Sequence, residues 1–296
     1  MQPQKRLPDR RAMNASYSTL IGALDLAQRL HDPDWVVFDC RFDLANPAFG
    51  HQAYLDGHVP GAFFLDLDDD LSSAKTGRNG RHPLPDPARL AARLAACGVS
   101  NHSQVVAYDD AGGMFAARLW WLLRWLGHHR VAVLDGGLRS WLSLGQPLDS
   151  TLPEAQQRTY TLSLRSERVD ADYVLEHLGS ADMVLIDARS PDRFRGENEA
   201  LDPVGGHIPG AINRFFRDNL DSKGCFKQPS VLREEFGALL GAHGPRQVVH
   251  QCGSGVTACV NALAMEAAGL PGSRLYAGSW SEWCADPSRP VARGSA

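Results

Sequence analysis

The sequence predicts an α/β fold made of two homologous domains, each with a mostly parallel sheet and helices on both faces. Two observations support this prediction. Four segments occur twice, in the same order and at similar spacing, and in both copies short β-branched runs alternate with helical patterns. Such an alternation is typical of parallel sheets that helices cover on both sides.

The repeated segments define the two domains. The first and second segments are 18 residues apart in one copy and 19 in the other, and the third and fourth are 29 and 27 apart. We expect domains at 13–147 and 165–296, of normal size, joined by the polar segment 145–167. The pairs are DCR (39–41) with DAR (187–189), GHVPGA (57–62) with GHIPGA (206–211), VVAYD (105–109) with VVHQC (248–252), and LDGGLRSW (134–141) with LYAGSWSEW (275–283).

Each copy contains runs that indicate buried strands. A helix is expected after Cys252, because Val260, Leu263, Ala264 and Ala267 share one helical face. Ligands of such sheets bind beyond the carboxyl ends of the strands, so Cys252 lies where a site is expected. The runs are VVFDC (36–40), VVAYD (105–109), VAVLD (131–135), MVLIDA (183–188), QVVHQC (247–252) and SRLYAG (273–278).

Composition excludes several classes of protein. Of 296 residues 44% are hydrophobic and 22% charged, which is typical of a soluble globular chain. The net charge of -4 does not indicate binding to nucleic acid or to an anionic membrane surface, for which an excess of basic residues is expected. No apolar run approaches the ~20 residues that span a bilayer, and the first 16 residues lack the apolar core of a signal peptide. We expect a cytoplasmic protein without nucleic-acid or membrane partners.

The six cysteines form no C-x-x-C pair and have no histidine at zinc spacing, so no metal site is expected. Cys252 stands apart because the glycines at 253 and 255 permit a tight loop whose amides form an anion cradle. The cradle and the following helix dipole favour thiolate over thiol. A buried structural cysteine is the alternative, and we expect that role for the other five. Asp109 occupies the corresponding place in the first copy, which predicts a catalytically silent domain.

From about residue 16 to 290 the chain resembles the tandem rhodanese sulfurtransferases, on the evidence of the paired GHxPGA segments, CGSGVTA (252–258) and YAGSWSEW. CGSGVTA is similar to the loop of 3-mercaptopyruvate sulfurtransferases, whereas thiosulfate-preferring members tend to carry cations just after the cysteine. The resemblance implies that Cys252 takes sulfur from a small-molecule donor, which we expect to be 3-mercaptopyruvate, and holds it as a persulfide. It implies transfer to cyanide or to a thiol acceptor, such as a thioredoxin-like protein or a low-molecular-weight thiol, without a cofactor.

The resemblance also assigns roles within the cysteine loop. The amides of Gly253, Ser254, Gly255, Val256 and Thr257 are expected to hold the persulfide. The hydroxyl groups of Ser254 and Thr257 can add hydrogen bonds to it.

Arg193 matches the family arginine that binds the donor's carboxylate or sulfonate, with a surface arginine paired to Asp192 or Glu197 as the alternative. The mercaptopyruvate enzymes usually have a second arginine shortly before GHIPGA, and this chain has none there. Arg195 is the candidate substitute, although its position does not match.

The stretch after GHVPGA is six residues longer in the first copy, and we expect it to contribute side chains across the domain interface. Within it, Asp68 and His82 match an Asp and a His that assist proton transfer with the loop serine, Ser254, a role suited to a near-neutral histidine. An acidic surface turn and a loop histidine are the alternative.

Several other residues are expected to be structural. We expect His58 and His207 to bond backbone, and the pairs Asp39–Arg41 and Asp187–Arg189 to brace strand ends. Trp280 and Trp283 suit either a pocket wall or the core.

Three functional alternatives remain. The first is a thiosulfate:cyanide sulfurtransferase, and the second is a sulfur carrier without turnover. The third, a C-x5-R phosphatase, needs an arginine six residues after the cysteine, where this chain has Ala258.

Overall fold

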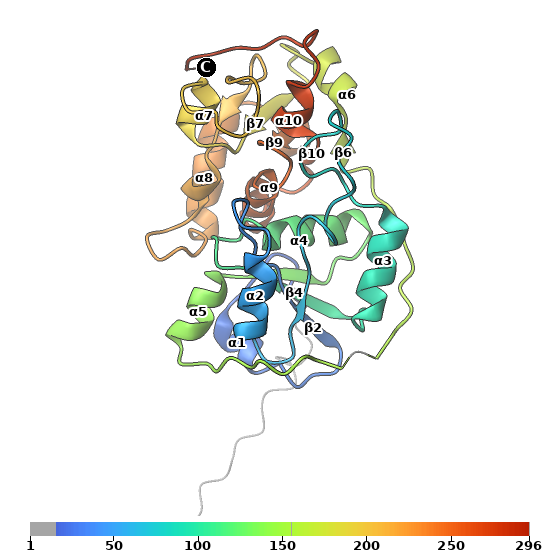
Figure 1. The fold of residues 1–296 in the computed structure, drawn as a ribbon. Helices are drawn as coiled ribbons and strands as arrows, with labels where there is room; N and C mark the ends of the chain where they lie inside the picture. The colour runs from blue at the N-terminus through green and yellow to red at the C-terminus, as the bar shows by residue number, and fades with distance from the viewer. Residues whose placement is uncertain (1–15, 155, 296) are drawn as a thin grey trace, which may run out of the picture.

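The computed structural model describes residues 16–154 and 156–295 and contains two domains of the same architecture (Figure 1). Each domain has a five-stranded sheet, in the order β1-β5-β4-β2-β3 in the first and β6-β10-β9-β7-β8 in the second. All strand pairs within these sheets are parallel. The predicted α/β class and duplication are confirmed.

The N-terminal domain alternates strands and helices along the chain. Helix α3 shows a local cause of this pattern, because the Asp86 side chain accepts from the Arg89 amide and Pro87 occupies the first turn. The elements are β1 (Leu20–Ile21), α1 (Ala23–Ala27), β2 (Trp35–Asp39), α2 (Phe49–Asp56), β3 (Phe63–Phe64), α3 (Pro87–Ala96), β4 (Gln104–Tyr108), α4 (Ala116–Trp125), β5 (Val131–Leu134) and α5 (Gly137–Ser143).

The C-terminal domain repeats this order, with two added 3-10 turns. The elements are β6 (Arg168–Val169), α6 (Ala171–Glu176), β7 (Val184–Asp187), α7 (Pro191–Arg195), β8 (Ile212–Asn213), η2 (Phe216–Asn219), α8 (Pro229–Leu240), η3 (Pro245–Gln247), β9 (Val248–Gln251), α9 (Ala258–Ala267), β10 (Arg274–Tyr276) and α10 (Ser279–Trp283).

The central strands end in register in both sheets. Asp39 of β2 pairs with Tyr108 of β4, and Asp187 of β7 pairs with Gln251 of β9. The residue after Gln251 is Cys252, which therefore lies at the carboxyl edge of the second sheet.

Buried ion pairs brace these strand ends, as predicted. Arg41 and Asp39 approach to 2.6 Å, and Arg189 and Asp187 approach to the same distance. Both carboxylates are fully buried, so each arginine satisfies an oxygen that water cannot reach.

Helices α4 and α9 pack against each other across the domain interface (Figure 1). The sequence predicted one buried face for the helix after Cys252, yet every residue from Ala258 to Met265 is buried. The second face is covered by α4, which belongs to the other domain. The helix that follows the cysteine loop is therefore fixed from both sides.

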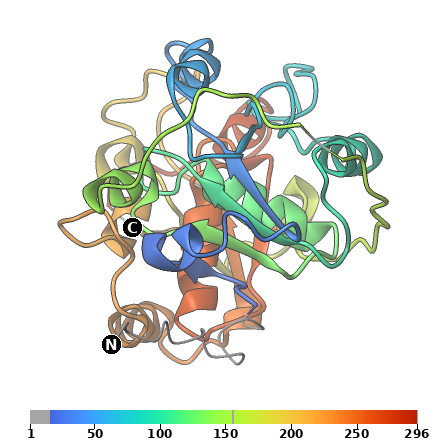
Figure 2. The ribbon, with the colours of Figure 1, turned by 90° about the horizontal axis from the view of Figure 1, so that it is seen from below.

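The described residues of the segment 145–167 form no helix or strand, yet they lie along the N-terminal domain (Figure 2). His58 and Asp149 exchange two backbone hydrogen bonds of 2.9 and 2.8 Å, and the Ser163 amide donates to Leu126 O. The end of the chain repeats the first of these contacts, because His207 and Ala292 form the same kind of bridge. Among residues 16–154 and 156–295, no helix has the length and hydropathy needed to cross a membrane.

Candidate active site

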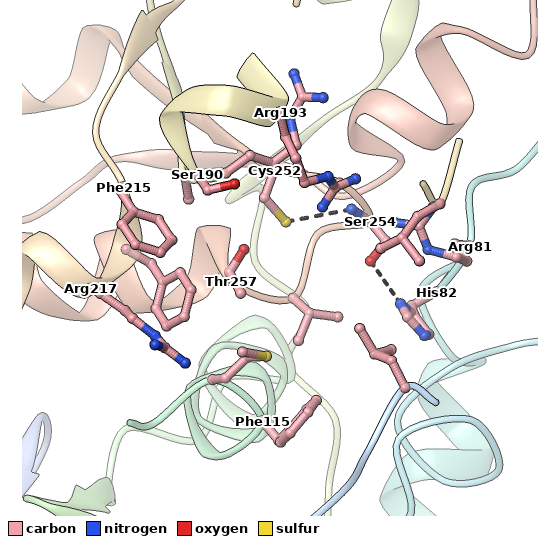
Figure 3. A pocket seen from close by; sticks show the side chains of 18 residues that line it. Arg81, His82, Phe115, Ser190, Arg193, Phe215, Arg217, Cys252, Ser254 and Thr257 are labelled. Carbon is pink, nitrogen blue, oxygen red and sulfur yellow. Dashed lines mark hydrogen bonds between the residues drawn. The ribbon is translucent and has the colours of Figure 1, made fainter. Parts of the chain in front are cut away.

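A cavity of about 240 Å³ lies between the two domains, with Cys252 on its wall (Figure 3). The C-terminal domain supplies the cysteine loop, Leu201 and residues near the starts of α7 and η2, and the N-terminal domain supplies Leu44, Arg81, His82, Met114 and Phe115. Among the described residues no Asp or Glu lines this cavity, whereas four arginines do, so it suits an anionic ligand. The arginines are Arg81, Arg189, Arg193 and Arg217.

Cys252 follows β9 directly and is only 2% exposed. Its sulfur accepts hydrogen bonds from the Gly255 amide at 3.1 Å and from the Ser254 amide at 3.5 Å. Val256 and Thr257 of the same loop also line the cavity. These contacts place two amide donors on the sulfur, the arrangement that stabilises a negative charge there.

The two loop glycines serve different purposes. Gly255 has a φ of +76°, and a Cβ there would lie 2.3 Å from the Ala277 carbonyl oxygen. Gly253 does not have a positive φ. A Cβ on Gly253 would instead lie 2.9 Å from Arg81 Nη2 and 3.6 Å from the guanidinium nitrogens of Arg193. Gly253 therefore makes room for two cations above the loop.

Ser279 holds the loop from the other side. Its hydroxyl accepts a hydrogen bond from the Cys252 amide at 3.1 Å and donates one to Tyr276 O at 2.9 Å. Its φ of 55° makes it the one non-glycine residue with a positive φ in the described chain. We assigned no role to Ser279 from the sequence.

Asp68, His82 and Ser254 lie next to one another in the structure. His82 Nδ1 lies 2.7 Å from Ser254 Oγ, and His82 Nε2 lies 3.7 Å from Asp68 Oδ1. His82 is 3% exposed, whereas Asp68 is one-third exposed and also pairs with Lys75 at 3.3 Å. His82 is thus a buried loop histidine in contact with Ser254, whereas Asp68 lies in a partly exposed turn.

The pKa of His82 is lower than the near-neutral value that the sequence led us to expect. Burial lowers the pKa of His82 to about 3, and the positive charges of Arg118, Arg81 and Lys75 lower it further in the same direction. The imidazole is therefore neutral at physiological pH and carries no resident charge.

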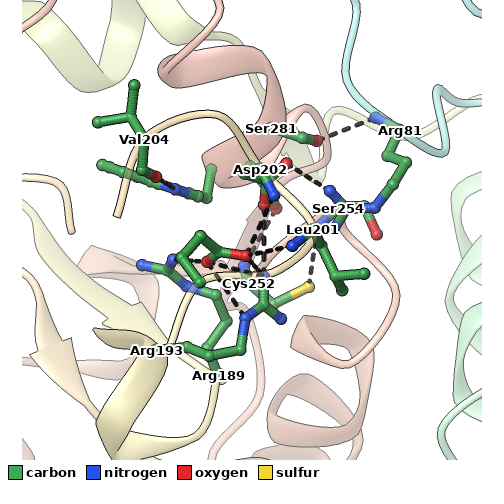
Figure 4. A network of polar contacts seen from close by, with 12 residues as sticks. Arg81, Arg189, Arg193, Leu201, Asp202, Val204, Cys252, Ser254 and Ser281 are labelled. Atoms are coloured by element: carbon green, nitrogen blue, oxygen red, sulfur yellow. Dashed lines mark hydrogen bonds and ion pairs between the residues drawn. The ribbon is translucent and has the colours of Figure 1, made fainter. Parts of the chain in front are cut away.

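Arg193 lines the cavity but is already engaged by acidic groups (Figure 4). Its guanidinium pairs with Glu199 at 2.8 Å and with Asp202 at 3.3 Å. The predicted alternative partners were Asp192 and Glu197, and only the Asp192 carboxylate contacts Arg193, through its backbone amide.

Arg195 does not substitute for the missing second arginine. It pairs with Glu197 at 2.7 Å and does not line the cavity. Arg81 of the N-terminal domain does line it and forms an ion pair with Asp202. Asp202 thus joins Arg81 and Arg193 into one network (Figure 4). Arg81 precedes His82 in the longer stretch of the first copy, which was the one sequence signal for it.

The longer stretch does reach across the interface. The Arg81 amide donates to Ser281 Oγ at 2.9 Å, so the segment is attached to α10. This contact holds Arg81 and His82 of the N-terminal domain next to the cysteine loop of the C-terminal domain.

Asp109 stands in the N-terminal domain where Cys252 stands in the C-terminal one, directly after the matching strand. Its carboxylate accepts four hydrogen bonds of 2.8–2.9 Å, from the backbone amides of Ala111, Gly113, Phe115 and Ala116. Burial raises the pKa of Asp109, and the four amides counteract that shift by favouring the carboxylate. The corresponding loop therefore holds an anion in its amide cradle.

The remaining expectations are structural. His58 Nδ1 bonds Tyr54 O at 2.8 Å and His207 Nδ1 bonds Phe194 O at 2.9 Å, as predicted. Trp280 and Trp283 are fully buried and belong to the core. In the described residues no group of three metal-ligating side chains comes together.

Comparison with known proteins agrees with this geometry. The rhodanese-like domain family matches residues 23–144 and 170–286. A probable 3-mercaptopyruvate sulfurtransferase of Pseudomonas aeruginosa is 50% identical over 94% of this chain and 99% of its own length. Thiosulfate sulfurtransferase of Bos taurus is 34% identical over 94% of this chain and 96% of its own length.

Solved structures give the same result. The 3-mercaptopyruvate sulfurtransferase SseA of Escherichia coli superposes with a TM-score of 0.76 at 31% identity, covering 89% of this chain and 99% of that one. The fold and the cysteine-loop cavity thus define a two-domain sulfurtransferase. The chain belongs to the rhodanese-like family and is an enzyme that transfers sulfur.

Proposed function

We propose that this enzyme takes sulfur from 3-mercaptopyruvate, holds it as a persulfide on Cys252, and passes it to a thiol or to cyanide. The observation that carries the choice of donor is the 2.7 Å contact between His82 and Ser254 at the cavity wall. Breaking the carbon–sulfur bond of mercaptopyruvate leaves an enolate that must gain a proton. Sulfite, the group that leaves thiosulfate, needs none.

Sulfur transfer takes place in two half-reactions. The Cys252 thiolate attacks the donor sulfur, a sulfur–sulfur bond forms, and the carbon–sulfur bond breaks to give pyruvate enolate. The proton of the donor thiol passes through Ser254, next to neutral His82, to the enolate carbon, leaving pyruvate and a persulfide anion. A thiolate or cyanide then takes the outer sulfur and regenerates the Cys252 thiolate.

Binding of the donor's carboxylate falls to Arg193 and Arg81, whose guanidinium groups lie above Gly253. A planar guanidinium suits a carboxylate because it can donate two parallel hydrogen bonds. Glu199 and Asp202 fix the positions of these cations and reduce their net charge, which favours a singly charged carboxylate over a dianion.

The amides of the cysteine loop hold the persulfide in this proposal. Gly253, Ser254, Gly255, Val256 and Thr257 surround the position that the outer sulfur takes, and the Gly255 and Ser254 amides already contact Sγ. The four amides on Asp109 support the assignment, because they accommodate an anion in the duplicated loop.

Thiosulfate is the second candidate donor. The four arginines around the cavity favour it, since a dianion gains from a cationic wall. The acceptor that we propose is a thioredoxin-like protein or a small thiol. Leu44 and Leu201 line the cavity from opposite domains at 47% and 50% exposure, and give a protein acceptor an apolar rim to contact.

The deciding experiment compares kcat/KM for 3-mercaptopyruvate and thiosulfate, each with dithiothreitol or cyanide as acceptor. Cys252→Ala should abolish both activities, while Cys225→Ser, at a half-buried cysteine outside the cavity, should keep them. Preference for thiosulfate overturns the proposed donor. A chain that gains a sulfur atom on Cys252 yet turns over neither donor is a sulfur carrier.

Arg193→Ala should raise KM for the donor, with Arg195→Ala as the matched control because Arg195 is paired outside the cavity. Equal effects of the two variants would contradict the role of Arg193.

A further inference from the structure

Arg118 is a fully buried arginine without a carboxylate partner in the described part of the chain. Its side chain projects from α4 of the N-terminal domain and is 0% exposed. The guanidinium donates to the carbonyl oxygens of Gly255 at 3.0 Å, His82 at 3.1 Å and Leu71 at 3.4 Å. All three acceptors are neutral backbone groups.

The other buried arginines are compensated. Arg41 pairs with Asp39 and Arg189 pairs with Asp187, both at 2.6 Å. A buried charge without such a partner is strongly destabilising, even when it is hydrogen-bonded. The position of Arg118 therefore calls for an anion that is present when the enzyme works.

The ionisable groups that act on Arg118 are two sulfurs, Cys259 and Cys252. Cys259 is fully buried and its thiol donates to Gly255 O at 3.3 Å, so it holds its proton. Burial also raises the pKa of Cys259 to about 12. Cys252 instead accepts amides and faces the cavity, so it is the sulfur that can carry the charge.

Among the described residues around Cys252, no other cation is both buried and free of an acidic partner. Arg189 and Arg193 are paired with acidic groups, as is Arg81. Arg217 is exposed to solvent, which screens its charge. His82 is neutral, because burial lowers its pKa to about 3.

We propose that Arg118 is the counter-ion of the Cys252 thiolate and of the persulfide anion formed on it. It is a positioning residue, which the N-terminal domain supplies to the cysteine loop. The inference rests on the proposed function in that it assumes Cys252 to be the reacting sulfur.

Two features of the geometry give Arg118 this effect. The Gly255 carbonyl that it binds belongs to the same peptide group as the Val256 amide, so the hydrogen bond polarises that N–H toward the loop interior. Arg118 also binds the His82 carbonyl, and so ties the proton relay and the sulfur cradle to one group.

The test is the pH profile of Cys252 alkylation by iodoacetamide, together with kcat and KM. Arg118→Met should move the midpoint of the profile upward by about one pH unit, a tenfold loss of thiolate at low pH. Arg118→Lys keeps the charge, so its profile should stay near that of the unaltered chain even if it loses hydrogen bonds. A purely structural role predicts similar damage from both variants, and that result would overturn the proposal.

Arg124→Met is the matched control. Arg124 lies on the same helix and also reaches the C-terminal domain, through Glu266 at 3.2 Å, but it binds the far end of α9. Its removal should weaken domain docking and leave the alkylation profile unchanged. A shift of the profile in Arg124→Met would show that docking, and not the charge of Arg118, sets the state of the sulfur.

A measurement on the unaltered chain covers the case that Arg118→Met does not fold. The Nε–H resonance of Arg118, assigned with Arg118→Lys, should shift with the ionisation of Cys252 and be insensitive to pH in Cys252→Ala. A resonance that ignores the ionisation of Cys252 contradicts the inference. If the enzyme turns over neither donor, but the alkylation profile of Cys252 still depends on Arg118, the proposed function is overturned and this inference stands.

Discussion

Ser279 and Gly137 occupy the same place in the two domains, with φ angles of 55° and 58°. The next residue in each case donates its amide to the carbonyl of the loop residue, Trp280 to Cys252 and Leu138 to Asp109. One copy thus meets the backbone requirement with glycine, and the other with a strained serine. The serine hydroxyl holds the Cys252 amide, which glycine cannot do.

This relationship predicts that Ser279→Ala is less stable than Ser279→Gly by about 1–2 kcal/mol. Both variants lose the two hydrogen bonds of the hydroxyl, but only alanine keeps a Cβ in the left-handed region. Urea unfolding of the two variants measures the difference. Equal stability would mean that the left-handed backbone is not strained here.

The His82–Ser254 contact predicts a donor-dependent loss of activity. Ser254→Ala and His82→Gln should each lower kcat with 3-mercaptopyruvate about 100-fold, because the enolate loses its proton source. With thiosulfate the loss should be much smaller, since sulfite leaves without a proton. Steady-state kinetics with both donors checks this, and equal losses would assign the two residues to shaping the loop.

The loop glycines predict two different defects. Gly253→Ala should raise KM with little change in stability, because its Cβ meets the movable ends of Arg81 and Arg193. Gly255→Ala should lower stability by more than about 1 kcal/mol, because its Cβ meets backbone at a positive φ. Thermal unfolding combined with kinetics separates the two effects. A destabilised Gly253→Ala with normal KM would contradict this division.

Buried histidines predict acid sensitivity. Burial lowers the pKa of His82 and His250 to about 3 and that of His128 to about 4, below the ~6.5 of an unfolded chain. The unfolded state therefore binds more protons between these values. Stability is fully present above pH 6.5 and is lost as the pH falls, by about 1.5 kcal/mol for each histidine between pH 6.5 and 5.

His250→Leu isolates one of these contributions, because neither ring nitrogen of His250 has a hydrogen-bond partner in the described structure. Urea midpoints between pH 8 and 5 should fall less steeply in His250→Leu than in the unaltered chain. His102→Gln, at an exposed turn, is the control and should keep the original slope. An unchanged slope in His250→Leu would show that His250 does not contribute.

The carboxylate of Asp109 predicts a stability role in the N-terminal domain. Asp109→Asn replaces one acceptor oxygen by an amino group and leaves two loop amides unsatisfied, at a cost of about 2–4 kcal/mol. Asp110→Asn, at the exposed neighbouring residue, should change stability little. Differential scanning calorimetry makes the comparison, and similar melting temperatures would contradict the role.

Repeated segments were sufficient to predict the fold, the place of Cys252 and the anion in the duplicated loop, because strand ends and glycine turns are local features. The contacts of Arg81, Arg118 and Ser279 could not be predicted in this way. Arg81 and Arg118 act across the domain interface, and their sequence neighbours carry no sign of that packing. Ser279 could have been found by aligning it with Gly137, since a serine in place of glycine marks a position with unusual backbone.

Packing also explains where local reasoning went wrong. The helix after Cys252 was expected to have one buried face, but α4 of the other domain covers the second. His82 was expected near neutral pKa, but the same interface removes it from water and lowers its pKa.

The paired bridges His58–Asp149 and His207–Ala292 have an evolutionary consequence. An ancestral unit that was copied head to tail must already have contained the tail that folds back on its GHxPGA turn. The residues from Leu144 to Asp149 are then the ending of one ancestral module, and the fusion point lies beyond Asp149. A dissection that aims to express each half alone should cut there, so that the N-terminal module keeps its own closing segment.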